Sequence, residues 1–326
     1  MTKYINLQLF AATVQTTLLD GLSAEMKTFY DMTLIDEAQA NLVHDQFGQK
    51  RPIPANGGKT IEFRKFAPLA KALTPLTEGV TPDGKSLEVS TITAEVAQYG
   101  DYITQSDVLE LTALDNTILE ATKLLGRQAG LTLDTIVRNV MQSGTNVTYC
   151  PKADGTAVTS RAGLDNTCQL TVDVVKQVVA KLRAQNAPTI GGKYVAIIHP
   201  YVAYDLMSDE RWIEAHKYAK PDNLYEGEIG EIAGVRFVQT TEAKVYEGGV
   251  FGSLFLGEGA YGVTEITGGG LQTIVKQKGS AGTADPLDQR SSVGWKAIKT
   301  AELLIPNYIV RVESKSKVFS ASAAEN

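Results

Sequence analysis

Two strand-like runs separated by a long, turn-rich segment constrain the fold of this chain more than any other feature. Residues 59–66 and 87–96 are rich in β-branched and aromatic residues, which roughly alternate with polar ones as in strands. The segment between them has almost nothing to bury and many residues typical of turns: Pro68, Pro75, Gly79, Pro82, Asp83 and Gly84. The sequence therefore predicts one long hairpin with an open tip. An isolated two-stranded ribbon is marginally stable, so we expect the hairpin to lie on another surface, such as a second copy of the chain.

The composition is typical of a globular protein and argues against several functions. The chain has 326 residues, enough for two lobes or one large domain, and a net charge of −6, which argues against a dedicated nucleic-acid binder. No run of about eighteen apolar residues is present and the N-terminus does not resemble a signal peptide, so we expect no membrane span and intracellular synthesis. Cys150 and Cys168 are too few for a disulfide framework, and we interpret them as incidental thiols of a reducing compartment.

Two helices are predicted on either side of the hairpin. Residues 23–45 carry apolar side chains at near-helical spacing. A longer helix is predicted from a cap at residues 115–116 to Gly144, with one apolar stripe along its length. Inside it, Gly126 and Gly130 lie on one face and each costs about 1 kcal/mol relative to alanine. This cost predicts the close approach of another element at the two glycines.

The second half of the chain predicts an α/β lobe. Thr171 can cap a helix whose apolar residues run from Val174 to Leu182, and a short buried strand follows at residues 194–198. Glycine-bounded segments predict further strands at residues 235–240, 250–256 and 271–276.

The C-terminal part predicts a last strand and a loose tail. Residues 301–312 form a strong strand-like run, in which Pro306 indicates an edge position or a bulge. We expect the tail, residues 314–326, to be frayed. Together the elements predict a mixed α+β architecture: an N-terminal arm, a hairpin flap, a spine helix, an α/β lobe, and terminal strands that return to the first lobe.

Residues that usually carry catalysis or bind metals are scarce. Only three histidines are present: His44, His199 and His216. His199 and His216 lack the short spacing or cysteine partners of a zinc site, and we interpret these two as ordinary partly buried or surface side chains. No Gly-x-Ser-x-Gly elbow is present, and the glycine clusters at 227–234 and 268–270 match neither the dinucleotide fingerprint nor the phosphate loop. The sequence therefore predicts turns at both clusters, and no catalytic site, metal or cofactor.

Charged residues gather in the hairpin and are the candidates for subunit contacts. These candidates are Arg64, Lys65, Lys71, Glu78, Asp83 and Lys85. One interpretation is a solvated strand face. The other is that the charges set the register against neighbouring subunits, where single pairs contribute little but a complementary pattern suppresses wrong docking.

Four short segments follow one another in a recognisable order. They are residues 7–11 (LQLFA), residues 47–54 (FGQKRPIP), residues 57–63 (GGKTIEF) and residues 293–296 (VGWK). In this order they resemble the major capsid proteins of tailed bacteriophages, and the similarity runs through most of the chain. Among these proteins, the chain resembles the family typified by the N4-like coliphage capsid protein.

The resemblance implies the tailed-phage capsid fold, also seen in encapsulin shells and the herpesvirus capsid floor. In that fold an arm and an extended loop reach across neighbours, and an axial lobe gathers around five- and six-fold positions. The resemblance implies five segments: an N-terminal arm and helix at 1–56, an extended hairpin loop at 57–102, a peripheral lobe with the spine helix at 103–170, an axial lobe at 171–290, and C-terminal strands returning to the peripheral lobe at 291–326.

By this resemblance we expect a structural protein of the virion, not an enzyme. It would self-associate as pentamers and hexamers into an icosahedral shell, enclosing double-stranded DNA without sequence-specific binding. A procapsid assembled in the host bacterial cytoplasm, a portal and room for a decoration protein are also implied. Because the chain begins directly with its arm, we expect a separate scaffolding protein.

Two alternatives remain open at this point. One is an encapsulin-like compartment shell that holds a cargo enzyme. The other, from a different class, is a two-lobed small-molecule-binding protein or α/β hydrolase, which would form a discrete oligomer and respond to a ligand with a higher melting temperature.

Overall fold

The chain folds into two compact units. The computed structural model describes residues 32–38, 42–54, 58–66, 69, 71–76, 78–81, 84–112, 117–216, 230–265, 269–280 and 285–326. Unit 1 is drawn from Met1–Asn41, Tyr99–Gly130 and Leu271–Ala297, and unit 2 from Leu42–Gln98, Leu131–Gly270 and Ile298–Asn326. Helix α3 (Thr117–Gln142) and strand β13 (Arg290–Leu303) contribute residues to both units.

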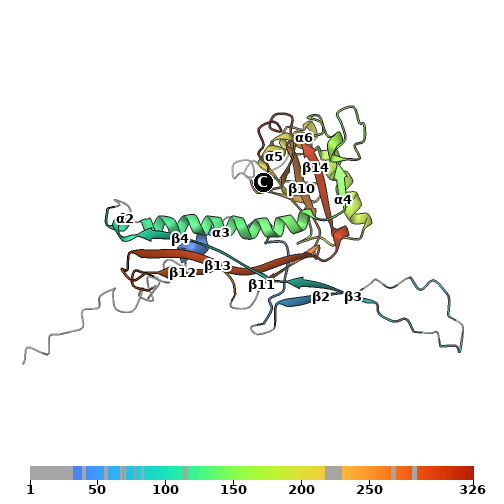
Figure 1. Ribbon diagram of the computed structural model, residues 1–326. Helices are drawn as coiled ribbons and strands as arrows, with labels where there is room; N and C mark the ends of the chain where they lie inside the picture. The colour runs from blue at the N-terminus through green and yellow to red at the C-terminus, as the bar shows by residue number, and fades with distance from the viewer. Residues whose placement is uncertain are drawn as a thin grey trace, which may run out of the picture. The chain divides into compact units, whose positions relative to one another are not determined.

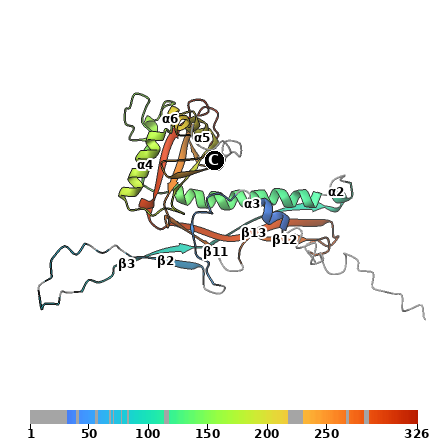
Figure 2. The same cartoon turned by 180° about the vertical axis from the view of Figure 1, so that it is seen from behind.

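A seven-stranded mixed sheet is the framework of unit 2 (Figures 1 and 2). Its strands follow the order β5 (Val147–Tyr149), β14 (Ile309–Lys315), β10 (Val250–Leu256), β6 (Tyr194–Ile198), β8 (Val235–Gln239) and β7 (Glu231–Ile232), and β9 (Val245–Tyr246) pairs with β10. Strand β10 is antiparallel to β14 and β6, whereas β6 runs parallel to β8 and β14 parallel to β5. The predicted strands at 194–198, 235–240 and 250–256 are confirmed.

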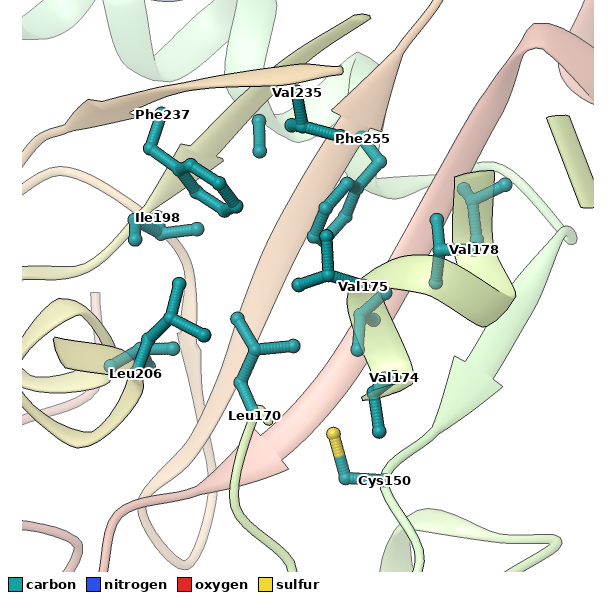
Figure 3. Packing of buried hydrophobic residues seen from close by; sticks show 14 of the residues in the cluster. Cys150, Leu170, Val174, Val175, Val178, Ile198, Leu206, Val235, Phe237 and Phe255 are labelled. Carbon is teal, nitrogen blue, oxygen red and sulfur yellow. The ribbon is translucent and has the colours of Figure 1, made fainter. Parts of the chain in front are cut away.

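The central strands of this sheet are buried on both faces. On one face, Ala196 and Ile198 of β6 join a cluster with α4 (Val172–Ala184) and α5 (Pro200–Met207). On the other face, Val195 and Ile197 pack with the last turns of α3. Figure 3 shows the first cluster, to which α4, β8 and β10 contribute Val175, Val178, Val235, Phe237 and Phe255. Because both faces are covered, β6 has a continuous apolar sequence instead of an alternating one.

Helix α4 confirms the predicted amphipathic helix, but its N-terminus is stabilised from elsewhere. The predicted apolar residues from Val174 to Leu182 are buried. Thr171 occupies the cap position without a capping hydrogen bond from its side chain. Instead, the carboxylate of Asp209, just before α6 (Glu210–His216), accepts the backbone N–H of Val172 at 2.9 Å. A carboxylate at this end also interacts favourably with the helix dipole.

The remaining strands of unit 2 include the predicted hairpin. Strands β2 (Thr60–Phe66) and β3 (Val89–Glu95) pair with each other and with no other strand of the described residues. Strand β11 (Tyr261–Glu265) pairs in parallel with β1 (Gln49–Lys50) and antiparallel with the second part of β13. The short 3₁₀ turn η2 (Arg161–Gly163) lies in the polar segment after β5.

In unit 1 a short helix lies closely against the first half of α3. Residues 32–38 are helical. A Cβ atom on Gly126 would lie 2.8 Å from the carbonyl oxygen of Leu34, and one on Gly130 would lie 2.5 Å from that of Ala38. The close approach predicted at these two glycines is confirmed, as is the long helix that contains them.

The predicted helix at residues 23–45 is confirmed only in its middle. Residues 23–31 lie outside the described residues, as do those at 39–41. The chain is no longer helical at Leu42 and Val43, and His44 to Phe47 form turns. The apolar spacing continues to residue 45, but residues 42–45 are not helical. Hydrogen bonds from another element hold the backbone at residues 43 and 44 instead.

Unit 1 also contains β4 (Ala97–Ser106), α2 (Asp107–Thr112) and β12 (Gln272–Lys276), which confirms the predicted strand at 271–276. The first part of β13 pairs with β4 and with β12. Gln128 on α3 connects the two long strands, because it donates to Asp101 of β4 at 2.6 Å and accepts from the indole of Trp295 on β13 at 3.3 Å.

The predicted closing strand at residues 301–312 is wrong as a single element. Strand β13 ends at Leu303, the 3₁₀ turn η5 (Pro306–Tyr308) redirects the chain, and β14 begins at Ile309. Pro306 therefore lies in a turn, neither at a strand edge nor in a bulge. Its fixed φ and missing N–H suit the first position of such a turn.

The tail is packed, so the expected fraying is also wrong. The ring of Phe319 stacks on that of Tyr201 in α5, with centroids 4.3 Å apart. At its end, the side-chain oxygen of Asn326 accepts the backbone N–H of Val245 at 2.9 Å. These partners are distant in sequence, so no local pattern in the tail indicates them.

His199 caps the N-terminus of α5 in its neutral form. Its Nδ1 atom accepts the backbone N–H of Tyr201 at 3.1 Å, and its ring lies 5.0 Å from that of Phe251 between centroids. Burial lowers the pKa of His199 to about 4. Protonation would place a positive charge among aromatic rings and remove the acceptor that caps the helix.

Replacing Gly130 with alanine tests the close approach on α3. Alanine favours a helix over glycine by about 1 kcal/mol. Here its Cβ would lie 2.5 Å from the oxygen of Ala38, so we expect Gly130→Ala to lower the free energy of unfolding by about 1–3 kcal/mol. Thermal unfolding by circular dichroism measures this. The control is Gly84→Ala, where no heavy atom lies within 4 Å; equal melting temperatures for both variants would contradict the contact.

The pH dependence of unfolding tests His199. An unfolded histidine has a pKa of about 6.5, so between about pH 6.5 and pH 4 the unfolded chain binds a proton that the folded chain does not. We therefore expect this group to reduce the free energy of unfolding as the pH falls through that window, with no effect above it. His199→Asn keeps a capping oxygen but does not titrate, so its denaturant midpoint should change less over the window. Parallel pH profiles for the two proteins would show that His199 is not the responsible group.

Candidate subunit-contact surface

The base of the hairpin is anchored on unit 2. Strands β2 and β3 are antiparallel, with Thr60 opposite Glu95 and Phe66 opposite Val89 (Figure 1). Phe63 is buried with Leu304, and its ring fills the space that a side chain at Gly262 would need. The predicted hairpin is confirmed, and its strands extend from this anchored base.

Beyond the base, the hairpin is uncovered. Every described residue from 69 to 91 is exposed. The exposed residues include five large apolar side chains in the loop: Leu69, Leu73, Leu76, Val80 and Leu87. Leu73 is 82% exposed and Leu76 76%. The expectation that the tip has almost nothing to bury is therefore wrong: it carries apolar groups that the subunit itself leaves in water.

The charged candidates are spread along the same loop. Arg64 on β2 is exposed, as are Lys71, Glu78 and Lys85 in the loop. The side chain of Lys65 and the whole of Asp83 lie outside the described residues. Arg64, Lys71 and Glu78 form no ion pair with another described residue. Among the described residues, Arg64, Lys71 and Glu78 therefore do not form one paired site, and we interpret them as parts of a distributed pattern.

The described part of the loop can therefore bind a surface. Its apolar side chains can be buried on a partner, and the outer edges of β2 and β3 carry backbone N–H and C=O groups that no described strand pairs. The leucines were a signal in the sequence, since apolar residues in a proline-interrupted segment cannot join a core. The sequence interpretation missed them because the turn residues and charges dominate this segment.

The remaining candidates for chemistry have structural roles. His44 is completely buried, and the side chain of His216 lies outside the described residues. Cys150 is free and buried, and burial raises the pKa of its thiol. The turn predicted at 227–234 is confirmed only at Ala233 and Gly234, which have positive φ angles, because Glu231 and Ile232 form β7; residues 227–229 and 266–268 are not described.

Two further searches cover only the described part of the chain. No group of three or more His, Cys, Asp or Glu side chains there could hold a metal ion. No helix there combines the length and apolar character needed to cross a membrane.

The comparison with protein families decides what this chain is. A sequence model described as phage capsid protein matches residues 88–304, which include α3, β11, β13 and every strand of the seven-stranded sheet except β14. The chain belongs to the phage capsid protein family. It is a structural shell protein of the virion that self-associates, and not an enzyme. The family match begins at residue 88, after the apolar loop residues.

Solved capsid structures share the fold of this capsid protein. The capsid of cyanophage P-SCSP1u has a TM-score of 0.66 and 14% identity over 84% of this chain and 88% of that chain. The capsid of cyanophage Pam1 has a TM-score of 0.67 and 12% identity over 86% and 92%. The capsid of Ralstonia phage GP4 has a TM-score of 0.65 and 15% identity over 84% and 88%. The predicted α+β tailed-phage capsid fold is therefore confirmed. No curated protein sequence matched the chain.

Substituting the tip leucines tests whether they are the contact. Because Leu73 and Leu76 are 82% and 76% exposed, the double change to serine should leave the free energy of unfolding within about 0.5 kcal/mol. Burial of each leucine on a partner would contribute about 1.5–3 kcal/mol, so we expect self-association to weaken at least tenfold. Sedimentation velocity over a concentration series measures it. Leu287→Ser, at a leucine 75% exposed outside the hairpin, is the control and should associate normally; equal association of both variants would contradict the assignment.

Proposed function

We propose that this capsid protein closes its shell by laying the hairpin loop on adjacent copies. The observation that carries the proposal is the exposure of every described residue from 69 to 91, five large apolar side chains of the loop among them. A monomer gains nothing from extending such a loop into water. A neighbouring copy that covers it removes the apolar area from water at about 25 cal/mol per Å².

Repetition of the hairpin contact around the shell makes weak single contacts sufficient for assembly. Each interface must offset the lost freedom of the joining subunit and the ordering of the loop, so a single contact is weak. In a closed shell every subunit both gives a hairpin and receives one, and the contacts add. The proposal therefore explains how a loop that is marginal in one subunit can be well ordered in the assembly.

The charges of the hairpin would select the partner surface. Arg64, Lys65, Lys71, Glu78, Asp83 and Lys85 are the candidates. Exposed ion pairs contribute little each, but like charges placed opposite one another oppose wrong registers. Raising the salt concentration should then increase misassembly more than it weakens association.

The rest of the proposed assembly is based on the resemblance to the major capsid proteins of tailed bacteriophages. We propose that subunits form pentamers and hexamers of a procapsid in the host bacterial cytoplasm, with a separate scaffolding protein, a portal and room for a decoration protein. The five segments bounded at residues 56, 102, 170 and 290 would serve as arm, extended loop, peripheral lobe, axial lobe and returning strands. The succession along the sequence of the segments at 7–11, 47–54, 57–63 and 293–296 supports a place in the N4-like branch of the family.

The shell would enclose double-stranded DNA without binding its sequence. The net charge of −6 supports this role, because dense basic contacts to phosphates would oppose packaging and ejection. The family match makes the encapsulin-like compartment less supported, and the small-molecule-binding protein or hydrolase less still.

Deleting residues 70–84 tests the proposed function. The deleted residues that are described are all exposed, so the subunit should keep its circular dichroism spectrum and its melting temperature. We expect negative-stain electron microscopy to show closed shells for the full chain and none for the deletion. Normal shells from the deletion would overturn the proposal. Shells from the full chain that contain protein cargo in place of DNA would favour the compartment alternative.

A further inference from the structure

The chain that leads into the hairpin is held by one buried carboxylate. Asp134 of α3 is completely buried, and its Oδ1 atom accepts the backbone N–H groups of Val43 at 2.9 Å and His44 at 2.7 Å. Its Oδ2 atom lies 2.6 Å from Nδ1 of the His44 ring, which is also completely buried. A carboxylate is only an acceptor, so Nδ1 must carry the proton and donate it.

A tyrosine holds the same turn from the opposite side. The hydroxyl of Tyr261, on β11, donates to the backbone carbonyl of His44. The ring of Tyr261 packs on Gly48, where a Cβ atom would lie 2.7 Å from Cε2 of that ring. Both the N–H and the C=O of His44 are therefore fixed, as well as its side chain.

A buried ion pair fixes the next residue. Asp45 lies 2.7 Å from the ammonium of Lys299 on β13, and the two side chains are 14% and 7% exposed. Pairs this buried are costly to form unless their geometry is good, and breaking one leaves an unpaired charge. The turn at residues 43–45 thus holds an unusual concentration of buried polar contacts for a segment outside any helix or strand.

Strand β11 contacts both this turn and the base of the hairpin. After the turn, β1 pairs with β11, and the N–H of Arg51 donates to the carbonyl of Val263 at 3.1 Å. Phe63 of β2 packs over Gly262 of β11. Strand β11 therefore contacts the turn and β1 through Tyr261 and Val263, and it contacts the base of the hairpin through Gly262. The position of the turn thus affects the position of the hairpin.

Directional polar contacts indicate a role in positioning. Apolar burial is non-directional and could hold this segment without fixing its register. A buried hydrogen-bond network fixes a single arrangement, at a cost when it is incomplete. Here Nε2 of His44 is buried with no partner among the described residues. The site thus accepts an unpaired polar atom while keeping the three bonds to Asp134.

We propose that His44 and Asp134 form a positioning clamp that sets the direction in which the hairpin leaves the subunit, and with it the angle at which adjacent copies join. The consequence for assembly rests on the proposed function, whereas the effect on the hairpin does not. His44 and Asp134 are positioning residues, since neither lies at the exposed contact surface.

The experiment measures the direction of the hairpin directly. Nitroxide labels are placed at Thr93→Cys on β3 and Lys176→Cys on α4, both exposed positions of unit 2, with buried Cys150 and Cys168 left in place. Double electron–electron resonance gives the distance distribution between the labels. His44→Leu keeps a side chain of similar size but no donor, and His44→Asn restores an N–H donor. Val310→Ala, in the core on β14, is the control for general destabilisation.

We expect the distance distribution to widen at least twofold in His44→Leu and to stay narrow in His44→Asn and Val310→Ala. The same width in His44→Leu and in the unsubstituted chain would overturn the clamp. Should His44→Leu fail to fold, Tyr261→Phe decides the question, because it removes only the hydroxyl bond to the His44 carbonyl and should widen the distribution in the same direction.

Electron microscopy of the same proteins then tests the consequence for assembly. We expect closed shells of one size for the unsubstituted chain and for Val310→Ala, and mixed or open particles for His44→Leu. A widened distribution with uniform shells would overturn the link between hairpin direction and shell geometry. A full chain that forms no shells would count against the proposed function, while the distance measurement would still decide the clamp.

Discussion

A two-stranded ribbon has a single layer, so it cannot cover apolar side chains at its own tip. In this capsid protein that constraint divides the hairpin in two. Its base is held by Phe63 against β11, and its loop exposes leucines such as Leu73 and Leu76. The rest of unit 2, with a sheet buried on both faces, provides the firm support that a projecting loop needs. The subunit therefore buries the apolar side chains of its core but leaves those of its contact surface exposed.

Local periodicity made much of this fold predictable from the sequence. The hairpin strands, α3, α4 and β6 each carry their own signal in the spacing or density of apolar residues, and each lies close to its predicted position. Gly126 and Gly130 predicted a close approach because glycine in a helix is costly without one. They could not show that residues 32–38 supply the partner, since that contact joins segments about ninety residues apart.

What the sequence could not show are features fixed by distant partners. Asp209, just before α6, stabilises the N-terminus of α4. Asp134 holds a turn at residues 43–44, where the apolar spacing of residues 23–45 predicted a helix. The tail looked loose because Tyr201, on which Phe319 stacks, is over a hundred residues away. At the contact surface, charges and turn residues in the sequence predicted a loop that reaches a neighbour. The sequence did not show that the leucines of this loop are exposed, because that depends on whether any other part of the subunit covers them.

The place of β14 has a consequence for the timing of synthesis. This strand lies inside the sheet, between β10 and β5, although it comes last among the strands of the chain. The ribosome must therefore translate to about residue 315 and the segment must leave the exit tunnel before the sheet can close. A nascent chain that has not yet reached this strand therefore lacks a finished sheet on which a neighbouring copy could assemble.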